Sequence, residues 1–363
     1  QEIYFPQINP IRISKAPSKN LFRKFKSFLK IVNHRKNNIY IKFLSKIDNF
    51  GYIKSKNLEN PRSKIIFYSV CLWGKEYIDL FNDVLIPSLL QKDNIPKLKK
   101  YGFDQKIFIF TKNNEYPLTK KNELKLNKYL TFEVVKNHIN KDFIDPKIYL
   151  KNSLITFTKK SLLKNAYSFI LTPDHVYGNK SIYNLFISSY HNEAGVACIG
   201  ARINWKKSHQ FFKKIFKEKK TLENQNLIAF TFKNLHPVMK KSINIKSNHT
   251  GTKIIPIDDK NYLVSQSRVN VCVVKFKKSD LIFFKSIEDY NNIDFFWPRL
   301  LIKEGRYKFI GNSEFIFYSE LTRESLKFEK NLKKNDIHNL YGKHKRLINH
   351  IVNETHYSLW KIK

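Results

Sequence analysis

Apolar runs of strand length alternate with helical patterns along residues 65–200. Residues 65–72 form the first run, and residues 77–90 then repeat apolar positions on one helix face, interrupted near the end by Pro87. Further strand-like runs follow at residues 106–111, 131–136, 167–172 and 195–200, with helical patterns at 150–166 and 181–191. Strands that alternate with helices are typical of βαβ units. The pattern therefore predicts a Rossmann-like α/β fold, with a mostly parallel sheet, flanking helices and the first four runs as neighbouring strands.

The rest of the chain consists of a less regular second half and two basic ends. A helical pattern covers residues 227–235, and a polar loop at 248–256 runs into a short strand. Residues 269–276 have the pattern of a strong strand. The predicted organisation is a basic N-terminal extension over residues 1–60, an α/β domain over 61–320 and a basic helical tail over 321–363.

A Phe-rich stripe marks residues 21–32 of the N-terminal extension. Phe22, Phe25 and Phe28 recur at helical spacing with basic residues between them. Such a basic amphipathic helix either lies on an anionic membrane surface or packs on the body of the protein.

The formal net charge of +37 raises the question of an anionic partner. Lys supplies 57 of the 67 basic residues, whereas specific phosphate and base recognition favours the planar fork of Arg. The chain is also rich in Asn, Ile, Phe and Tyr, which share A/T-rich codons with Lys. We therefore attribute the charge mainly to background composition and attraction to acidic membranes, with nucleic acid as the alternative partner.

Three cysteines and the absence of long apolar segments bear on the compartment. Cys71, Cys198 and Cys272 lie in separate apolar runs, which is typical of reduced, buried thiols. The sequence has no run of 18 apolar residues and no signal-peptide core. It therefore predicts a cytoplasmic protein, either soluble or peripheral to the inner face of the membrane.

Asp174 is the most informative polar position, because it follows the apolar run at 167–172. An acidic side chain at the carboxyl end of a buried strand is how open α/β sheets build ligand sites. The alternative is a turn residue that caps a helix starting near Ser181. The signatures GxGxxG, GxxxxGK[ST], HExxH and GxSxG are absent, which argues against NAD enzymes, kinases, P-loop NTPases and serine hydrolases.

A series of short motifs runs through roughly residues 64–265. It opens at Ser69 with SVCLWGKEYIDLFNDVLIPSLLQKDNIPKL and continues with IFIFT, which ends at Thr111. Pro173-Asp174, Leu235-His236-Pro237 and Ile257-Asp258-Asp259 follow. In this order the motifs resemble a group of bacterial glycosyltransferase-like proteins of surface polysaccharide assembly.

The resemblance implies a GT-A-type fold that transfers a sugar from a nucleotide-sugar donor to a glycan or lipid-linked acceptor. The implied donor-binding residues are Ser69, Trp73, Gly74, Thr111 and Arg202, with Arg202 as a cation for the diphosphate.

The implied catalytic residues are Asp174, His236 and Asp258, since transfer needs a base near the acceptor hydroxyl. Asp174, with His175 beside it, is also the candidate ligand of a Mg²⁺ or Mn²⁺ ion. The segment Pro173-Asp174-His175-Val176 lacks the second carboxylate of an Asp-x-Asp pattern, so metal dependence stays open.

Each candidate also has a structural alternative. Trp73 would then be a core side chain beside a tight turn, His236 a helix-end residue packed locally, and Asp258 a solvated turn residue. The alternative for the whole chain is a non-catalytic basic α/β protein that binds nucleic acid or serves as an assembly subunit. The enzyme interpretation predicts that Trp73, Asp174, His236 and Asp258 converge on one cleft.

Overall fold

The computed structural model describes residues 63–112, 116–136, 146–240, 243, 252–256, 261–266, 270–287, 293–323 and 356–361. The N-terminal extension over residues 1–60, with its Phe-rich segment at 21–32, lies outside these residues. Asp258 lies outside them too. The predictions made for these parts of the chain therefore stay predictions.

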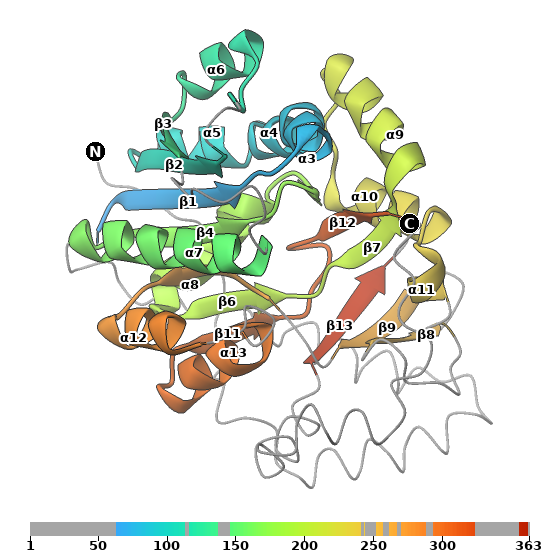
Figure 1. Cartoon of the computed structure of the whole chain (residues 1–363). Coiled ribbons are helices and arrows are strands. Elements are labelled where there is room, and N and C mark those ends of the chain that lie inside the picture. Colours follow the sequence, from blue (N-terminus) through green and yellow to red (C-terminus); the bar gives the residue numbers. More distant parts are fainter. Residues whose placement is uncertain are drawn as a thin grey trace, which may run out of the picture.

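A seven-stranded sheet forms the centre of the molecule, in the order β11-β6-β10-β4-β1-β2-β3 (Figure 1). All neighbouring pairs are parallel except the two that β10 makes, with β4 and with β6. The four strands predicted as neighbours are adjacent, in the order β4-β1-β2-β3. The strands are β1 (Ile65–Cys71), β2 (Asp104–Thr111), β3 (Thr131–Lys136), β4 (Tyr167–Leu171), β6 (Gly195–Cys198), β10 (Val271–Lys275) and β11 (Tyr307–Ile310).

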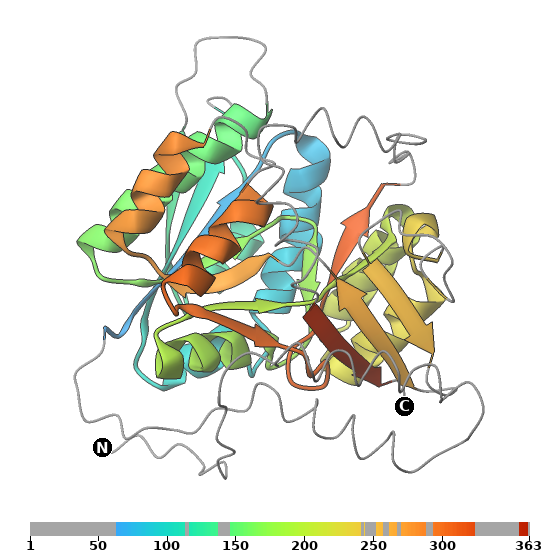
Figure 2. The same ribbon diagram turned by 90° about the horizontal axis from the view of Figure 1, so that it is seen from below.

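Helices cover both faces of this sheet, because its central strands alternate apolar side chains to either side. Ile66, Tyr68 and Val70 of β1 pack with the helices of one face, and Phe67 packs on the other. The first face carries α3 (Lys75–Leu80), η1 (Phe81–Leu85), α4 (Ile86–Leu89), α5 (Ile95–Lys100), α6 (Lys120–Leu126) and α8 (Ser181–Asn192). The second carries α7 (Pro146–Leu163), α12 (Lys278–Ser286) and α13 (Ile293–Lys303) (Figure 2). The predicted α/β architecture is confirmed.

The helix after β1 contains one wide turn just before its proline. The segments α3, η1 and α4 are continuous, and η1 is a π-helical turn directly upstream of Pro87. Proline has no backbone N–H to donate and its ring crowds the preceding turn, so a widened turn accommodates it without ending the helix. The sequence pattern locates the disturbance but not its form.

Side-chain amides tie the end of this helix to the loop before α8. Asn94 donates to the carbonyl oxygens of Ser88 (2.8 Å) and Gly178 (3.2 Å), and its Oδ1 accepts from the backbone N–H of Ile182 (3.0 Å). Gln91 likewise donates to the Tyr177 carbonyl at 2.9 Å. The Asn-x-Pro of the resembling segment therefore has a structural task in this fold.

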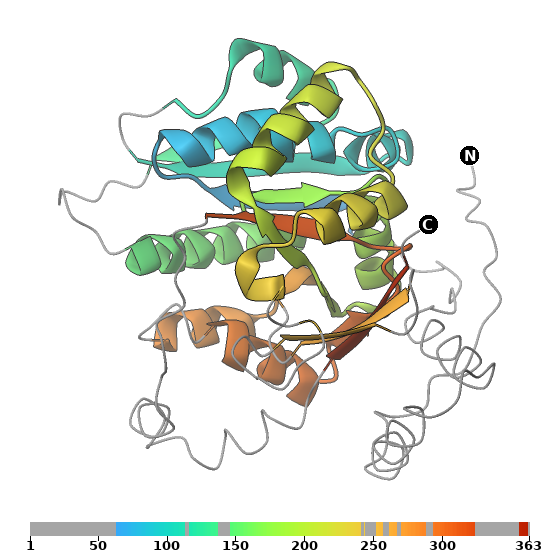
Figure 3. The same ribbon diagram turned by 90° about the vertical axis from the view of Figure 1, so that its right-hand side faces the viewer.

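A smaller sheet, β5-β12-β7, continues beyond the end of β4. Its strands are β5 (His175–Tyr177), β12 (Tyr318–Thr322) and β7 (Ala201–Asn204). The central strand β12 is antiparallel to β5 and parallel to β7. One face packs on α9 (Trp205–Lys217), α10 (Asn224–Lys233) and α11 (Pro237–Lys240), and α9 also crosses the helix after β1 (Figure 3).

The end of the chain belongs to the fold as a strand. β13 (His356–Lys361) pairs with β9 (Asn261–Gln266), which in turn pairs with β8 (Thr252–Pro256). Trp360 is fully buried and packs its ring edge-to-face against Phe317 and Phe232. The prediction of a helical tail over residues 321–363 is therefore wrong at this end. Ser358 and Trp360, two residues apart, both face inwards, which is the period of a strand.

Two further observations bear on expectations from the sequence. Cys71, Cys198 and Cys272 are free thiols, as predicted. Among the residues that the structure describes, no helix has the length and apolarity needed to cross a bilayer.

Candidate active site

The carboxyl ends of β1 and β4 form the point at which the sheet changes direction. From β1 the chain first adds β2 and β3 on one side, and then returns to place β4 on the other side of β1. In open α/β sheets the crevice at such a point is where ligands bind. Trp73 and Gly74 follow β1, and Asp174 follows β4, so three sequence-predicted residues lie at this edge.

An aromatic wall borders the site. The ring of Tyr77 lies 5.0 Å from that of Trp73 and 5.6 Å from that of Trp205, measured between centroids. The Arg323 guanidinium lies 5.4 Å from the Trp205 ring and 5.8 Å from the Tyr77 ring, and it contacts the Glu76 carboxylate. The wall thus joins α3, the start of α9 and the end of β12.

A second carboxylate accompanies Asp174, supplied by Glu320 of β12. Glu320 is paired with His175 in the sheet register, and the backbone N–H of Leu321 donates to the Asp174 carbonyl at 2.9 Å. Arg202 of β7 stands on the other side of Glu320, with its Nε 3.3 Å from the carboxylate. The strand β12 therefore brings together an acidic pair and an arginine that are far apart in the sequence.

The surroundings of Asp174 give its carboxyl group a pKa that is unusual for an aspartate. Burial, and after it the negative charge of Glu320, raises the pKa of Asp174 from 3.8 to about 7, although part of its surface remains in solvent. Burial also raises the pKa of Tyr77, with the charge of Asp174 as the next cause. A carboxyl group that titrates near neutral pH can accept or release a proton under physiological conditions.

The raised pKa predicts how stability depends on pH. An acid whose pKa rises on folding binds a proton more tightly in the folded state, so the free energy of unfolding falls as pH rises from about 4 to about 7. Asp174→Asn removes the titrating group, so the free energy of unfolding of the variant should not show this fall. We expect the variant to be more stable than the wild type at pH 8, by on the order of 1–2 kcal/mol for a partly solvated group, and the difference to vanish near pH 4. Thermal melts across this range measure it, and equal melting temperatures at pH 8 would contradict it.

His175 lies opposite Glu320 in the small sheet, and its ring packs among aromatic side chains. Its ring is buried against Tyr318, at 4.6 Å between centroids, and its Nδ1 lies 3.2 Å from the Tyr177 hydroxyl. Burial lowers the pKa of His175 to about 4, so the ring is neutral at physiological pH. His175 is therefore a neutral side chain that packs in the small sheet.

His236 lies near the wall but is engaged by the backbone. Its Nδ1 accepts from the N–H of Val238 (3.3 Å), so Nε2 carries the proton and donates to the Arg323 carbonyl (3.0 Å). The backbone N–H of His236 donates to the Arg202 carbonyl at 2.9 Å. Because both ring nitrogens are occupied and the residue is 1% exposed, His236 positions Arg202 and Arg323 in this structure, and is not poised as the base expected from the sequence.

The remaining donor-site candidates differ in their surroundings. Ser69 is buried in β1 and its hydroxyl donates to the Phe169 carbonyl at 3.3 Å, and Thr111 is buried at the end of β2. Gly74 has a φ of +80°, which favours glycine, and a Cβ there would meet nothing within 4 Å. Gly74 thus serves the turn conformation and leaves open space beside Trp73.

Sequence reasoning missed Glu320, Tyr77, Trp205 and Arg323. Tyr77 and Trp205 occupy helix positions that suggest ordinary packing, and Glu320 lies in a five-residue strand without a motif. Only the pairing of β12 with β5 and β7 reveals the second carboxylate, so no signal local to Glu320 could have identified it.

No protein-family model matches this chain, and no curated protein matches it either. Among solved structures, it is similar to a protein described as a glucose-1-phosphate thymidylyltransferase from Bacillus anthracis, crystallised with sucrose. The TM-score is 0.30 with 10% sequence identity, and the match covers 67% of this chain and 85% of that one. At this level of similarity we infer nothing about activity from it.

Proposed function

We propose that this protein is a glycosyltransferase that moves a sugar from a nucleotide-sugar donor to a glycan or lipid-linked acceptor. The observation that carries the proposal is the Asp174 carboxyl group, whose pKa is raised to about 7 beside Glu320, at the direction change of the sheet. General bases work best when their pKa lies near the operating pH. The resemblance of the motif series to glycosyltransferase-like proteins supports the same function.

In this proposal Asp174 is the base that takes the proton of the acceptor hydroxyl as the bond to the sugar forms. Burial, and after it the negative charge of Glu320, keeps the pKa of Asp174 high. Arg202 and Arg323 offset the negative charge that develops on the departing diphosphate. Trp205 and Tyr77 provide ring faces on which the nucleobase of the donor stacks.

A divalent cation remains part of the proposal. Asp174 and Glu320 offer hard oxygen ligands, and Mg²⁺ is commonly held by one or two carboxylates together with substrate phosphates. Within the described ranges no three His, Cys, Asp or Glu side chains gather as a metal-binding group. If bound, Mg²⁺ or Mn²⁺ would be held by these two carboxylates and would neutralise diphosphate charge.

The proposed donor indicates the cellular compartment in which the reaction takes place. Nucleotide sugars are cytoplasmic metabolites, so we place the protein in the cytoplasm. A position on the inner face of the membrane would bring it to a lipid-linked acceptor.

Donor binding is tested by thermal denaturation against a panel of nucleotides and nucleotide sugars, with and without Mn²⁺. A ligand at about a hundred times its Kd should stabilise the fold by about 2.7 kcal/mol. Trp205→Phe should keep most of this stabilisation and Trp205→Ala should lose it, because the stacking ring is removed. Tyr116→Ala, at an aromatic side chain 60% exposed in the loop before α6, is the matched control. Absence of stabilisation by every nucleotide and nucleotide sugar would overturn the donor assignment.

A further inference from the structure

A second pocket lies at the opposite edge of the main sheet from Asp174. It has a volume of about 460 Å³, and its lining includes Lys100, Tyr101 and Tyr129, which lie two to four residues before the starts of β2 and β3. The carboxylate pair lies beyond the other ends of the neighbouring strands. Since β1 has seven residues, the two edges are separated by about 20 Å at ~3.3 Å per residue. The pocket is therefore a different site.

Three lysines give this pocket its charge. Lys92, Lys97 and Lys100 line it with a single carboxylate, that of Asp93, which accepts a hydrogen bond from the Asn179 amide (2.9 Å). None of the ion pairs among the described residues involves these three lysines. Lys97 instead lies over the Tyr183 ring, with its Nζ 4.0 Å from the centroid. The pocket thus carries a net positive charge, because one carboxylate accompanies three lysines.

The surface beside the pocket is also positively charged. Burial lowers the pKa of Lys125, and the charges of Lys121, Lys219 and Lys128 lower it further. Lys128 directly precedes Tyr129 of the pocket. Lysines that crowd one another in this way favour the approach of an anion.

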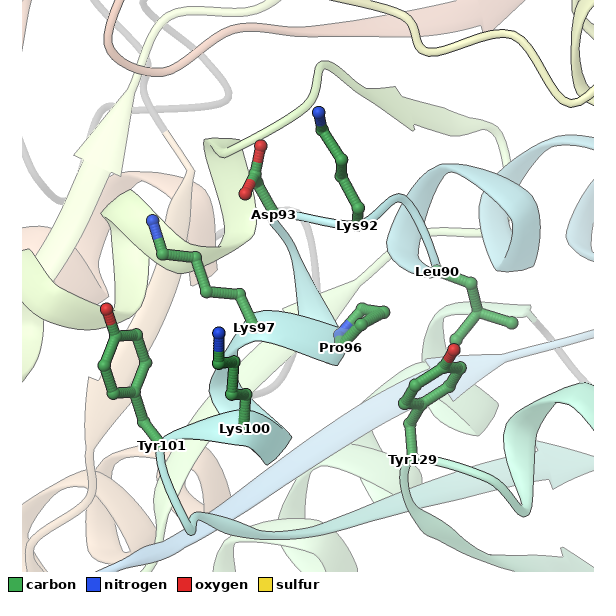
Figure 4. A pocket seen from close by; sticks show the side chains of 8 residues that line it. All are labelled: Leu90, Lys92, Asp93, Pro96, Lys97, Lys100, Tyr101 and Tyr129. Carbon is green, nitrogen blue, oxygen red and sulfur yellow. The ribbon is translucent and has the colours of Figure 1, made fainter. Parts of the chain in front are cut away.

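Tyrosine rings give the pocket a second property. Figure 4 shows the side chain of Lys100 between the rings of Tyr101 and Tyr129. Tyr129 offers an apolar ring face and a hydroxyl that both donates and accepts hydrogen bonds. The Tyr101 ring also lines the pocket and is held in place by stacking on Tyr183, at 5.8 Å between centroids. The volume falls within the range of about 300–1,000 Å³ typical of small-molecule sites. A sugar ring has apolar C–H faces and a rim of hydroxyls, so it matches this lining.

We propose that this pocket binds a sugar unit that carries an oxyanion, either a phosphate or a carboxylate. Lys92, Lys97 and Lys100 would pair with the oxyanion as point charges, and Tyr101 and Tyr129 would contact the ring and its hydroxyls. The site is independent of the proposed donor site and does not rest on the proposed transfer reaction. If transfer does occur at Asp174, an anionic sugar in an acceptor chain is the natural occupant.

Calorimetric titration of the full chain tests the proposal with four probes: glucose 6-phosphate, glucuronate, glucose and inorganic phosphate. We expect at least one of the two anionic sugars to bind about tenfold or more tightly than either glucose or phosphate alone. Which of them binds identifies the oxyanion. If phosphate binds as tightly as both anionic sugars, or if neither anionic sugar binds, the proposal is overturned.

Substitutions locate the binding. Lys100→Gln and Tyr129→Ala should each weaken binding of the anionic sugar about tenfold, since each removes a charge-assisted or ring contact. Lys100 is exposed, so its replacement should leave the fold intact if the variant at Tyr129 proves unstable. Lys303→Gln, at an exposed lysine of α13, is the matched control and should change nothing. Equal weakening by the control would show that only the overall charge is sensed. Undiminished binding by Lys100→Gln would show that the sugar binds elsewhere, and either result would overturn the site.

Two further titrations separate the alternatives. Nucleotide-sugar binding should be the same in Lys100→Gln and the wild type, so failure of the donor site and failure of this pocket are distinguishable. A short single-stranded oligonucleotide should not compete with the anionic sugar. Competition that depends on Lys100 would replace the sugar with nucleic acid as the ligand.

Discussion

Asp174→Asn is expected to abolish sugar transfer while the protein stays folded. The amide keeps the size of the side chain but cannot accept the proton of an acceptor hydroxyl or hold a cation. The loss should reach about 10²–10⁴-fold, the contribution typical of a general base. Because the wild-type carboxylate is destabilised near neutral pH, the variant should melt at a higher temperature than the wild type at pH 8. Transfer assays together with thermal melts measure both outcomes.

The pH profile of the wild type and a second variant provide the control. Transfer should rise through about pH 7 as Asp174 loses its proton. Glu320→Gln removes the neighbouring negative charge, which should lower the pKa of Asp174 and move the rise to lower pH. If the Asp174→Asn variant is active, Asp174 has only a structural role in the turn. If the pH profile of Glu320→Gln is unshifted, the charge of Glu320 does not influence the pKa of Asp174.

Arg306→Met should lower the free energy of unfolding by about 3–5 kcal/mol, the cost typical of leaving one partner of a buried ion pair alone. Asp280 is 0% exposed and Arg306 5%, and two guanidinium nitrogens lie within 3.2 Å of the carboxylate. Trp297 Nε1 (2.9 Å) and the backbone N–H of Lys277 (2.7 Å) also donate to Asp280. These donors would remain, but the cation that balances the buried charge would be gone. Urea denaturation followed by circular dichroism measures the loss.

The double variant Asp280→Leu/Arg306→Met distinguishes a buried charge from lost packing. Removing both partners leaves no isolated charge, so the double variant should be more stable than Arg306→Met. Ligand binding at the Asp174 site should persist, because this ion pair lies on the α12 and α13 side of the main sheet. A loss below about 1 kcal/mol in Arg306→Met would indicate that water reaches Asp280 in the variant.

The main sheet could be predicted because its strands carry the pattern of full burial. β1, β2 and β4 have helices on both faces, so their sequences are nearly continuous apolar runs that stand out from their neighbours. That four of these strands are neighbours followed from their alternation with helices, but their order in the sheet did not. The small sheet was harder to predict from the sequence, because β5 has only three residues and continues directly from the turn after β4.

The candidate site could be predicted only in part, because residue type does not determine orientation. Asp174 was found from its position after a strand. His175 and His236 were assigned chemistry because of their imidazoles, but one ring faces the core and the other bonds to the backbone. Glu320 approaches Asp174 only through strand pairing across 146 positions (320 − 174), a contact that a local pattern does not contain.

The place of β12 in the middle of its sheet has a consequence for biosynthesis. β5 and β7 are both made early, yet they have no neighbour in common until residues 318–322 insert between them. At about 5–20 residues per second, the ribosome adds Glu320 roughly 7–30 s after Asp174. A nascent chain therefore carries an incomplete acidic pair throughout that interval. The raised pKa of Asp174 would therefore arise only after residues 318–322 have joined β5 and β7, and it would report on the assembly of the small sheet.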